Sequence, residues 1–109
     1  MSYHEECYNK IQSIQEPTEE HKASLTHEML GGAAAFEAMR LYNKKKQEEG
    51  ANPENDHHLA KELLAGLAGA SVDRLVETKG MNWFDRQKAK HHAEEEAQKL
   101  YSKETGFNF

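Results

Sequence analysis

The fold is constrained above all by the scarcity of proline: the 109 residues contain only two, Pro17 and Pro53. A proline ring removes a backbone donor and breaks a helix interior, so the long stretches without proline leave room for long helices. Within these stretches apolar residues recur at alternating spacings of four and three, as one side of a helix requires. The sequence shows no strand-like alternation. We therefore predict an all-α protein, an antiparallel three-helix bundle that follows a short N-terminal arm.

Capping residues predict the boundaries of the three helices. Glycine is favoured just after a helix, and Gly50, Gly80 and Gly106 each follow a helical pattern. Asn82 and Asp85 have the spacing of a capping box at the start of the third helix. The predicted helices run from between Thr18 and Ser24 to Glu49, from Asn55 or Asp56 to Lys79, and from near Asn82 to Gly106.

Residues 1–17 form the N-terminal arm, and residues 18–106 form a single helical domain. The apolar residues of the arm lie near helical spacing, and Pro17 stops the pattern. The arm is therefore either a fourth, short helix or a partly ordered tail. The residues that lie near this spacing are Tyr3, Cys7, Tyr8, Ile11 and Ile14.

Glycines and alanines lie inside two of the predicted helices. A glycine inside a helix costs about 1 kcal/mol relative to alanine, so another effect must offset that cost. We predict that the small residues of the first helix face those of the second, which allows close backbone approach; a ligand cavity against them is the alternative. The second helix has the broadest apolar face and is predicted to be central and most buried. The facing sets are Gly31, Gly32, Ala33, Ala34, Ala35 and Ala38, and Ala65, Gly66, Ala68, Gly69 and Ala70.

The charge and cysteine content narrow the classes of function. A net charge of −5 repels a phosphate backbone, so we expect no nucleic-acid partner. Apolar runs are far shorter than the roughly 20 residues that span a bilayer, and the N-terminus lacks the pattern of a signal peptide. The single cysteine, Cys7, favours a reducing compartment. We expect a cytoplasmic protein without a membrane partner.

The stretch from His27 to Tyr101 resembles the CipC-like family, small concanamycin-induced or stress-induced proteins found mainly in fungi. The resemblance implies a helical, intracellular and stress-responsive protein. That family has no established biochemical function, so the resemblance supplies no catalytic residues. The segments that carry it are His27-Glu28, Gly32 to Met39, Ala60 to Gly66, Glu77 to Gly80, Trp83 to Asp85, and Ala89 to Ala93.

Seven histidines are the residues best suited to bind a divalent metal such as Zn, Cu or Ni. An antiparallel register places His92 level with Glu37 and near Asp73, so these three residues form the predicted metal site. Each has a simpler interpretation. His92 is then a hydrogen-bonded residue at the edge of the core, and Glu37 pairs with Arg74. We expect His4, His57 and His91 at the surface.

No enzyme mechanism follows from these residues, because a nucleophile with a positioned base cannot be assembled from them. We therefore expect a non-enzymatic stress-associated bundle without a cofactor, which acts by forming a homodimer or by binding another protein. The alternative is a metal- or small-molecule-binding protein centred on Glu37, Asp73 and His92.

Overall fold

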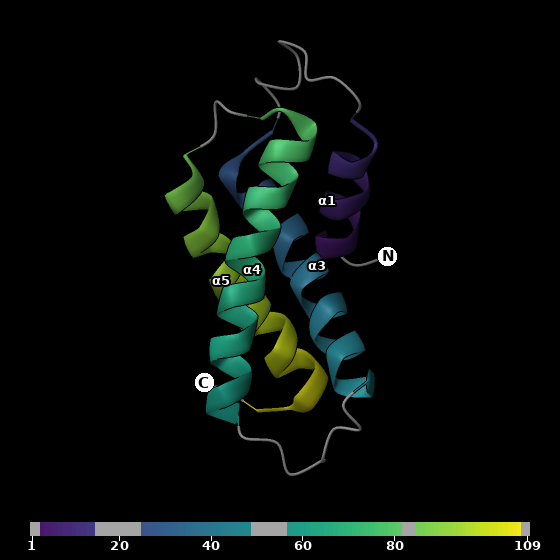
Figure 1. Ribbon diagram of the computed structural model, residues 1–109, viewed down its shortest axis with the longest axis vertical. Helices are drawn as coiled ribbons and strands as arrows, with labels where there is room; N and C mark the ends of the chain where they lie inside the picture. Colours follow the sequence, from purple (N-terminus) through teal and green to yellow (C-terminus); the bar gives the residue numbers. More distant parts are fainter. Residues whose placement is uncertain (1–2, 15–24, 49–56, 82–84, 108–109) are drawn as a thin grey trace.

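The computed structural model describes residues 3–14, 25–48, 57–81 and 85–107. These residues form four helices and no strand. Helix α4 runs antiparallel to both α3 and α5, which therefore run in the same direction, and α1 lies along α3 (Figure 1). The all-α prediction is confirmed, and the arm forms a fourth packed helix. The helices are α1 (Tyr3–Gln12), α3 (His27–Glu48), α4 (His57–Lys79) and α5 (Arg86–Thr105).

Helix α3 begins later than its sequence pattern indicated. The hydroxyl of Thr26 accepts a hydrogen bond from the backbone N–H of Met29 at 3.1 Å, so Thr26 is the N-cap. The predicted start between Thr18 and Ser24 is wrong, because Leu25 and Thr26 are not helical. Several polar residues precede the helix, and only the local backbone decides which of them becomes the cap. The predicted C-terminal glycine, at position 50, lies outside the described residues.

The C-terminus of α4 is fixed by Gly80, as predicted. Gly80 has φ of 66°, a left-handed conformation that glycine adopts without a steric penalty. The N–H of Met81 then donates to the carbonyl of Val76 at 2.9 Å. Both of these side chains are fully buried. This is a Schellman motif, in which the chain reverses and a hydrophobic contact seals the helix end.

Helix α5 begins at Arg86 rather than near Asn82. The carboxylate of Asp85 accepts hydrogen bonds from the backbone N–H groups of Gln87 and Lys88, at 3.1 and 3.2 Å. Asp85 is therefore the N-cap itself and not the third residue of a capping box. Residues 82–84, which include the predicted cap and both neighbouring aromatic residues, lie outside the described part of the chain. The predicted end at Gly106 is confirmed by its φ of 78°.

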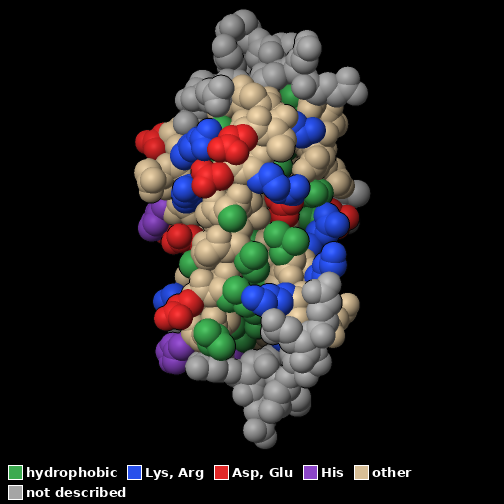
Figure 2. Space-filling model, in the orientation of Figure 1, with side chains coloured by type: hydrophobic (Ala, Val, Ile, Leu, Met, Phe, Trp, Pro, Cys, Tyr) green, Lys and Arg blue, Asp and Glu red, His purple; other side chains and the backbone are tan. Residues whose placement is uncertain are grey.

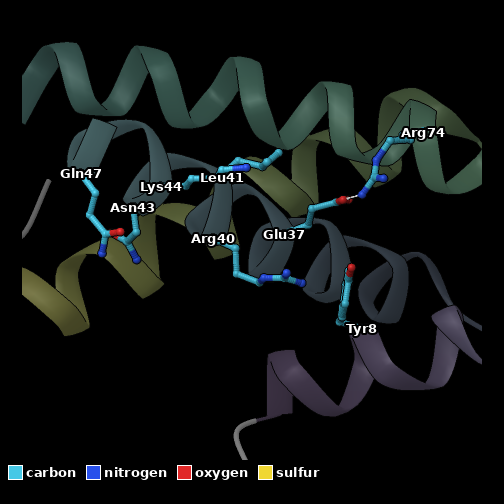
Figure 3. A pocket seen from close by; sticks show the side chains of 8 residues that line it. All are labelled: Tyr8, Glu37, Arg40, Leu41, Asn43, Lys44, Gln47 and Arg74. Atoms are coloured by element: carbon cyan, nitrogen blue, oxygen red, sulfur yellow. Dashed lines mark ion pairs between the residues drawn. The ribbon is translucent and has the colours of Figure 1, made fainter. Parts of the chain in front are cut away.

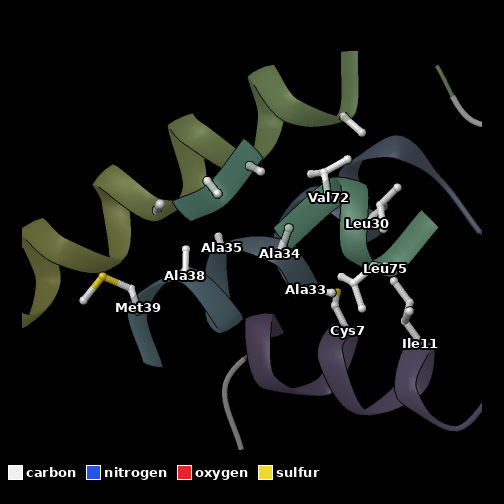
Figure 4. Close-up of a cluster of buried hydrophobic side chains, with 14 of the residues drawn as sticks. Cys7, Ile11, Leu30, Ala33, Ala34, Ala35, Ala38, Met39, Val72 and Leu75 are labelled. Carbon is white, nitrogen blue, oxygen red and sulfur yellow. The ribbon is translucent and has the colours of Figure 1, made fainter. Parts of the chain in front are cut away.

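The central helix of the bundle is α3, which packs closely against each of the other three described helices, whereas α4 only touches α1. Its residues Leu30 to Ala35 are all buried, and Figure 4 shows small side chains of α3 between α5 on one side and α1 on the other. The prediction that the second long helix is the most buried is wrong. Helix α4 keeps one side exposed, including Leu59, whose side chain is 62% exposed. The prediction relied on the large apolar residues of α4. Burial instead favours α3, because its small residues let neighbouring helices pack closely around it.

The two glycines of α3 face different helices. A Cβ atom built on Gly31 would lie 2.7 Å from the Cβ of His92 on α5, a distance that real Cβ atoms do not reach. A Cβ on Gly32 would lie 3.5 Å from the Sγ of Cys7 on α1. Close backbone approach therefore accounts for Gly31, but its partner is α5. The prediction that the small residues of α3 face those of α4 is therefore wrong for Gly31, Gly32 and Gly66, and it stays a prediction for the alanines.

Candidate functional site

One open cavity of about 510 Å³ runs along α3 where α1 and α4 flank it (Figure 3). We call it the Glu37 groove. Helix α1 contributes Tyr8 and α4 contributes Arg74, while six residues come from successive turns of α3. Because α1 packs along the N-terminal half of α3, its tyrosine reaches one end of this groove. The lining residues are Tyr8, Glu37, Arg40, Leu41, Asn43, Lys44, Gln47 and Arg74.

Glu37 is a buried acid in the wall of this groove, with 4% of its surface exposed. Its Oε1 forms an ion pair with the guanidinium of Arg74, which reaches across from α4. The simpler interpretation of Glu37, a pair with Arg74, is confirmed. Its other oxygen, Oε2, is buried and has no hydrogen-bond partner among the described residues. A buried charged acceptor without a partner costs free energy, so this oxygen requires an explanation.

Arg40 is held at the groove by two aromatic rings. Its guanidinium carbon lies 5.5 Å from the ring centre of Tyr8 and 5.9 Å from that of Phe36. These distances are typical of cation–π contacts. The rings of Tyr8 and Phe36 also contact each other, with centres 5.2 Å apart. The docking of α1 therefore fixes the position of a cation in the groove.

The three residues of the predicted metal site do not gather at one place. Asp73 forms ion pairs with Lys90 at 3.0 Å and with Arg86 at 3.3 Å. His92 instead packs beside Gly31, six residues before Glu37 and so about 9 Å further along the axis of α3. The assumed register was wrong by that amount. No three His, Cys, Asp or Glu side chains of the described residues are grouped to hold a metal ion. Metal binding by Glu37, Asp73 and His92 stays a prediction.

Two histidines that were expected at the surface are half-buried and contact another helix. His4 on α1 pairs with Glu96 on α5 at 3.0 Å. His57 lies 2.5 Å from the hydroxyl of Tyr101 and stacks on Phe107, with ring centres 3.9 Å apart. His91 is exposed, as expected, and pairs with a glutamate on its own helix. The contacts of His4 and His57 join α1 and α4 to α5, which is a structural role.

Asp73 provides a test of the ion pairs between α4 and α5. Its pKa is held below the usual range, chiefly by the hydrogen bond from Lys90, with Arg86 adding to the effect. A lowered pKa in the folded state adds stability above the unfolded pKa of about 3.9, and this stability is lost as the pH falls through the lower folded-state pKa. We expect Asp73→Asn to be less stable than the parent by about 0.3–1 kcal/mol at pH 7. Urea unfolding from neutral to acidic pH should show that this difference disappears in acid.

A second feature of the surface is the outer face of α4. We define the outer α4 face as Leu59, Leu63, Gly66, Leu67 and Ala70. Leu59, Gly66 and Ala70 are exposed, while Leu63 and Leu67 are partly buried at the edge of the core. Figure 2 shows hydrophobic side chains gathered on the side of the molecule on which α4 lies in front. A Cβ atom on Gly66 would meet nothing within 4 Å.

Sequence reasoning missed Tyr8, Arg40 and Lys44 as parts of the groove. One signal was present, because Arg40 follows Phe36 by four residues and so shares its side of the helix. Tyr8 could not be placed, since the arm carries no local indication of the helix on which it packs. Lys44 belongs to a run of three lysines that the sequence does not distinguish.

A protein-family model described as "Virulence factor CipC-like" matches residues 8–104. The match extends beyond the segment from His27 to Tyr101 and includes part of α1. No curated protein and no solved structure shows a significant match to the chain. None of the described helices combines the length and apolar character that crossing a membrane requires.

Proposed function

The chain belongs to the family of virulence factor CipC-like proteins, and from this premise we propose that it acts without catalysis, as a stress-associated helical protein that self-associates. The surface that supports the proposal is the outer α4 face. The stress association comes from the sequence resemblance to the concanamycin-induced and stress-induced proteins. We place this activity in the cytoplasm.

The observation that carries the proposal is Gly66. It lies in the interior of a 23-residue helix, where glycine costs about 1 kcal/mol relative to alanine. Gly31 recovers such a cost through its contact with α5, but no described residue approaches the Cβ position of Gly66. Gly66 and Ala70 are four residues apart and lie on the same ridge of the helix. Because Gly66 has no side chain and Ala70 has only a methyl group, the backbone of a second helix could cross this ridge at close distance.

A second copy of the chain is the partner that fits this face best. Two copies related by a two-fold axis present the same surface to each other, so one small-residue ridge serves both. The leucines beside the ridge supply apolar area to bury. Lys61 and Glu62, exposed at the rim, have opposite charges, so the net charge of −5 is not concentrated where the two copies would meet.

Sedimentation equilibrium of the purified chain tests the proposal. Gly66→Gln and Ala70→Gln each place a long polar side chain on the ridge and are expected to weaken dimerisation by about tenfold or more, which is about 1.4 kcal/mol. Lys88→Gln, at an exposed position on α5, is the matched control and should leave the dimer unchanged. A parent chain that stays monomeric would overturn self-association. A cellular protein lost from pulldowns with Gly66→Gln would then identify the face as a site for another protein.

A further inference from the structure

We propose that the Glu37 groove is a binding site for a small phosphorylated polyol, of the chemical class of the sugar phosphates. The volume of the groove, about 510 Å³, lies within the range of small-molecule sites. Three kinds of group line it, namely cations, one buried carboxylate, and neutral hydrogen-bonding side chains. Each kind sets one requirement on the ligand.

The cations require an anion. Arg40, Lys44 and Arg74 line the groove together with one acid, Glu37, so the lining carries a surplus of two positive charges. This surplus occurs in a chain whose net charge is −5. Arg40 contacts aromatic rings, and no described acid forms an ion pair with it or with Lys44. A phosphate group has up to two charges and three acceptor oxygens, which suits guanidinium and ammonium donors.

The buried carboxylate requires a donor on the same ligand. Oε1 of Glu37 pairs with Arg74, and Oε2 is buried without a hydrogen-bond partner among the described residues. The Arg74 side chain is 54% exposed, so its guanidinium has room to turn toward a bound phosphate. Because a guanidinium has five N–H donors, Arg74 can contact the phosphate and keep its pair with Oε1, while a shift of the pair opens the carboxylate to the groove. A ligand hydroxyl that donates to Glu37 would then satisfy an acceptor that is costly to leave unpaired.

The neutral residues of the groove favour a ligand whose middle part, between the phosphate and the hydroxyl that donates to Glu37, is hydrophilic. Asn43 and Gln47 bring amide groups that both donate and accept hydrogen bonds, and Tyr8 brings a hydroxyl. Leu41 is the aliphatic residue of the lining. An inorganic phosphate ion would leave Oε2 of Glu37 without a donor, and a neutral sugar would leave the cations without an anion. A phosphorylated polyol answers both requirements.

Calorimetric titration of the full chain with glucose 6-phosphate, inorganic phosphate, glucose and citrate tests the proposal. We expect glucose 6-phosphate to bind at least about tenfold more tightly than each of the other three. Equal binding of inorganic phosphate would overturn recognition of the hydroxyl groups, and tighter binding of citrate would overturn the phosphate class. Absence of binding by all four would overturn the site.

Two substitutions locate the binding. Lys44→Gln should weaken binding of glucose 6-phosphate by about tenfold, whereas the neighbouring control Lys45→Gln, outside the groove lining, should leave it unchanged. Glu37→Gln should reduce the preference for glucose 6-phosphate over inorganic phosphate, and circular dichroism checks that this variant folds. Equal effects of Lys44→Gln and Lys45→Gln would indicate general charge attraction and overturn the site. Gly66→Gln, which is expected to weaken the dimer, should bind glucose 6-phosphate as the parent does. This separates ligand binding in the groove from self-association.

Discussion

Gly31→Ala is expected to destabilise the folded chain by about 1–3 kcal/mol, although alanine forms helices better than glycine does. The added methyl group would lie 2.7 Å from the Cβ of His92 and 3.1 Å from the backbone nitrogen of Ala93. A backbone atom cannot turn aside as the end of a flexible side chain can, so α3 and α5 must separate. Urea unfolding followed by circular dichroism measures the loss.

Gly66→Ala is the matched control for this prediction, because it makes the same substitution in a helix where the Cβ has open space. We expect it to raise the unfolding free energy of the monomer by up to about 1 kcal/mol. The two variants should therefore move stability in opposite directions. If Gly31→Ala were as stable as Gly66→Ala, the close packing of α3 on α5 would be incorrect.

Removing the cation that faces Glu37 is expected to be comparably severe. Arg74→Met keeps most of the aliphatic length of the side chain but leaves a carboxylate that is 4% exposed without its ion pair. Loss of one partner of a buried pair costs about 3–5 kcal/mol. Arg74 is half exposed, so solvent already screens the pair, and we expect a loss of about 2–3 kcal/mol. Chemical denaturation at neutral pH measures it.

A double-mutant cycle separates the loss of the pair from the loss of packing. Adding Glu37→Met to Arg74→Met removes the buried charge together with its cation, and should restore most of the stability. A double variant as unstable as Arg74→Met alone would show that arginine packing, rather than the charge pair, was responsible.

The helix ends that the sequence predicted correctly are those set by local chemistry. Gly80 and Gly106 take a left-handed conformation that other residues rarely adopt, so their positions carry the information by themselves. The start of α3 was misjudged because Thr18, Ser24 and Thr26 can all cap a helix. Choosing among them depends on where the chain meets the rest of the bundle, which no single residue records.

The candidate site was predictable only in part. The pair of Glu37 with Arg74 follows from two opposite charges at similar levels on neighbouring helices, and the structure has it. The position of His92 required the register of α5 against α3, which depends on the close approach of the two helices at Gly31. The roles of Tyr8 and Arg40 depend on α1 docking on α3, a contact that sequence periodicity does not report.

The central place of α3 has a consequence for synthesis on the ribosome. Its partner α5 is the last of the described helices to be made, so the side of α3 that α5 covers stays uncovered until α5 has been synthesised. That side includes the small residues Gly31, Ala35 and Ala38 beside the larger Met39, as Figure 4 shows for the two alanines and the methionine. Small residues expose little apolar area each. We therefore expect the small-residue part of this side to offer chaperones and neighbouring nascent chains little apolar surface before α5 closes the bundle.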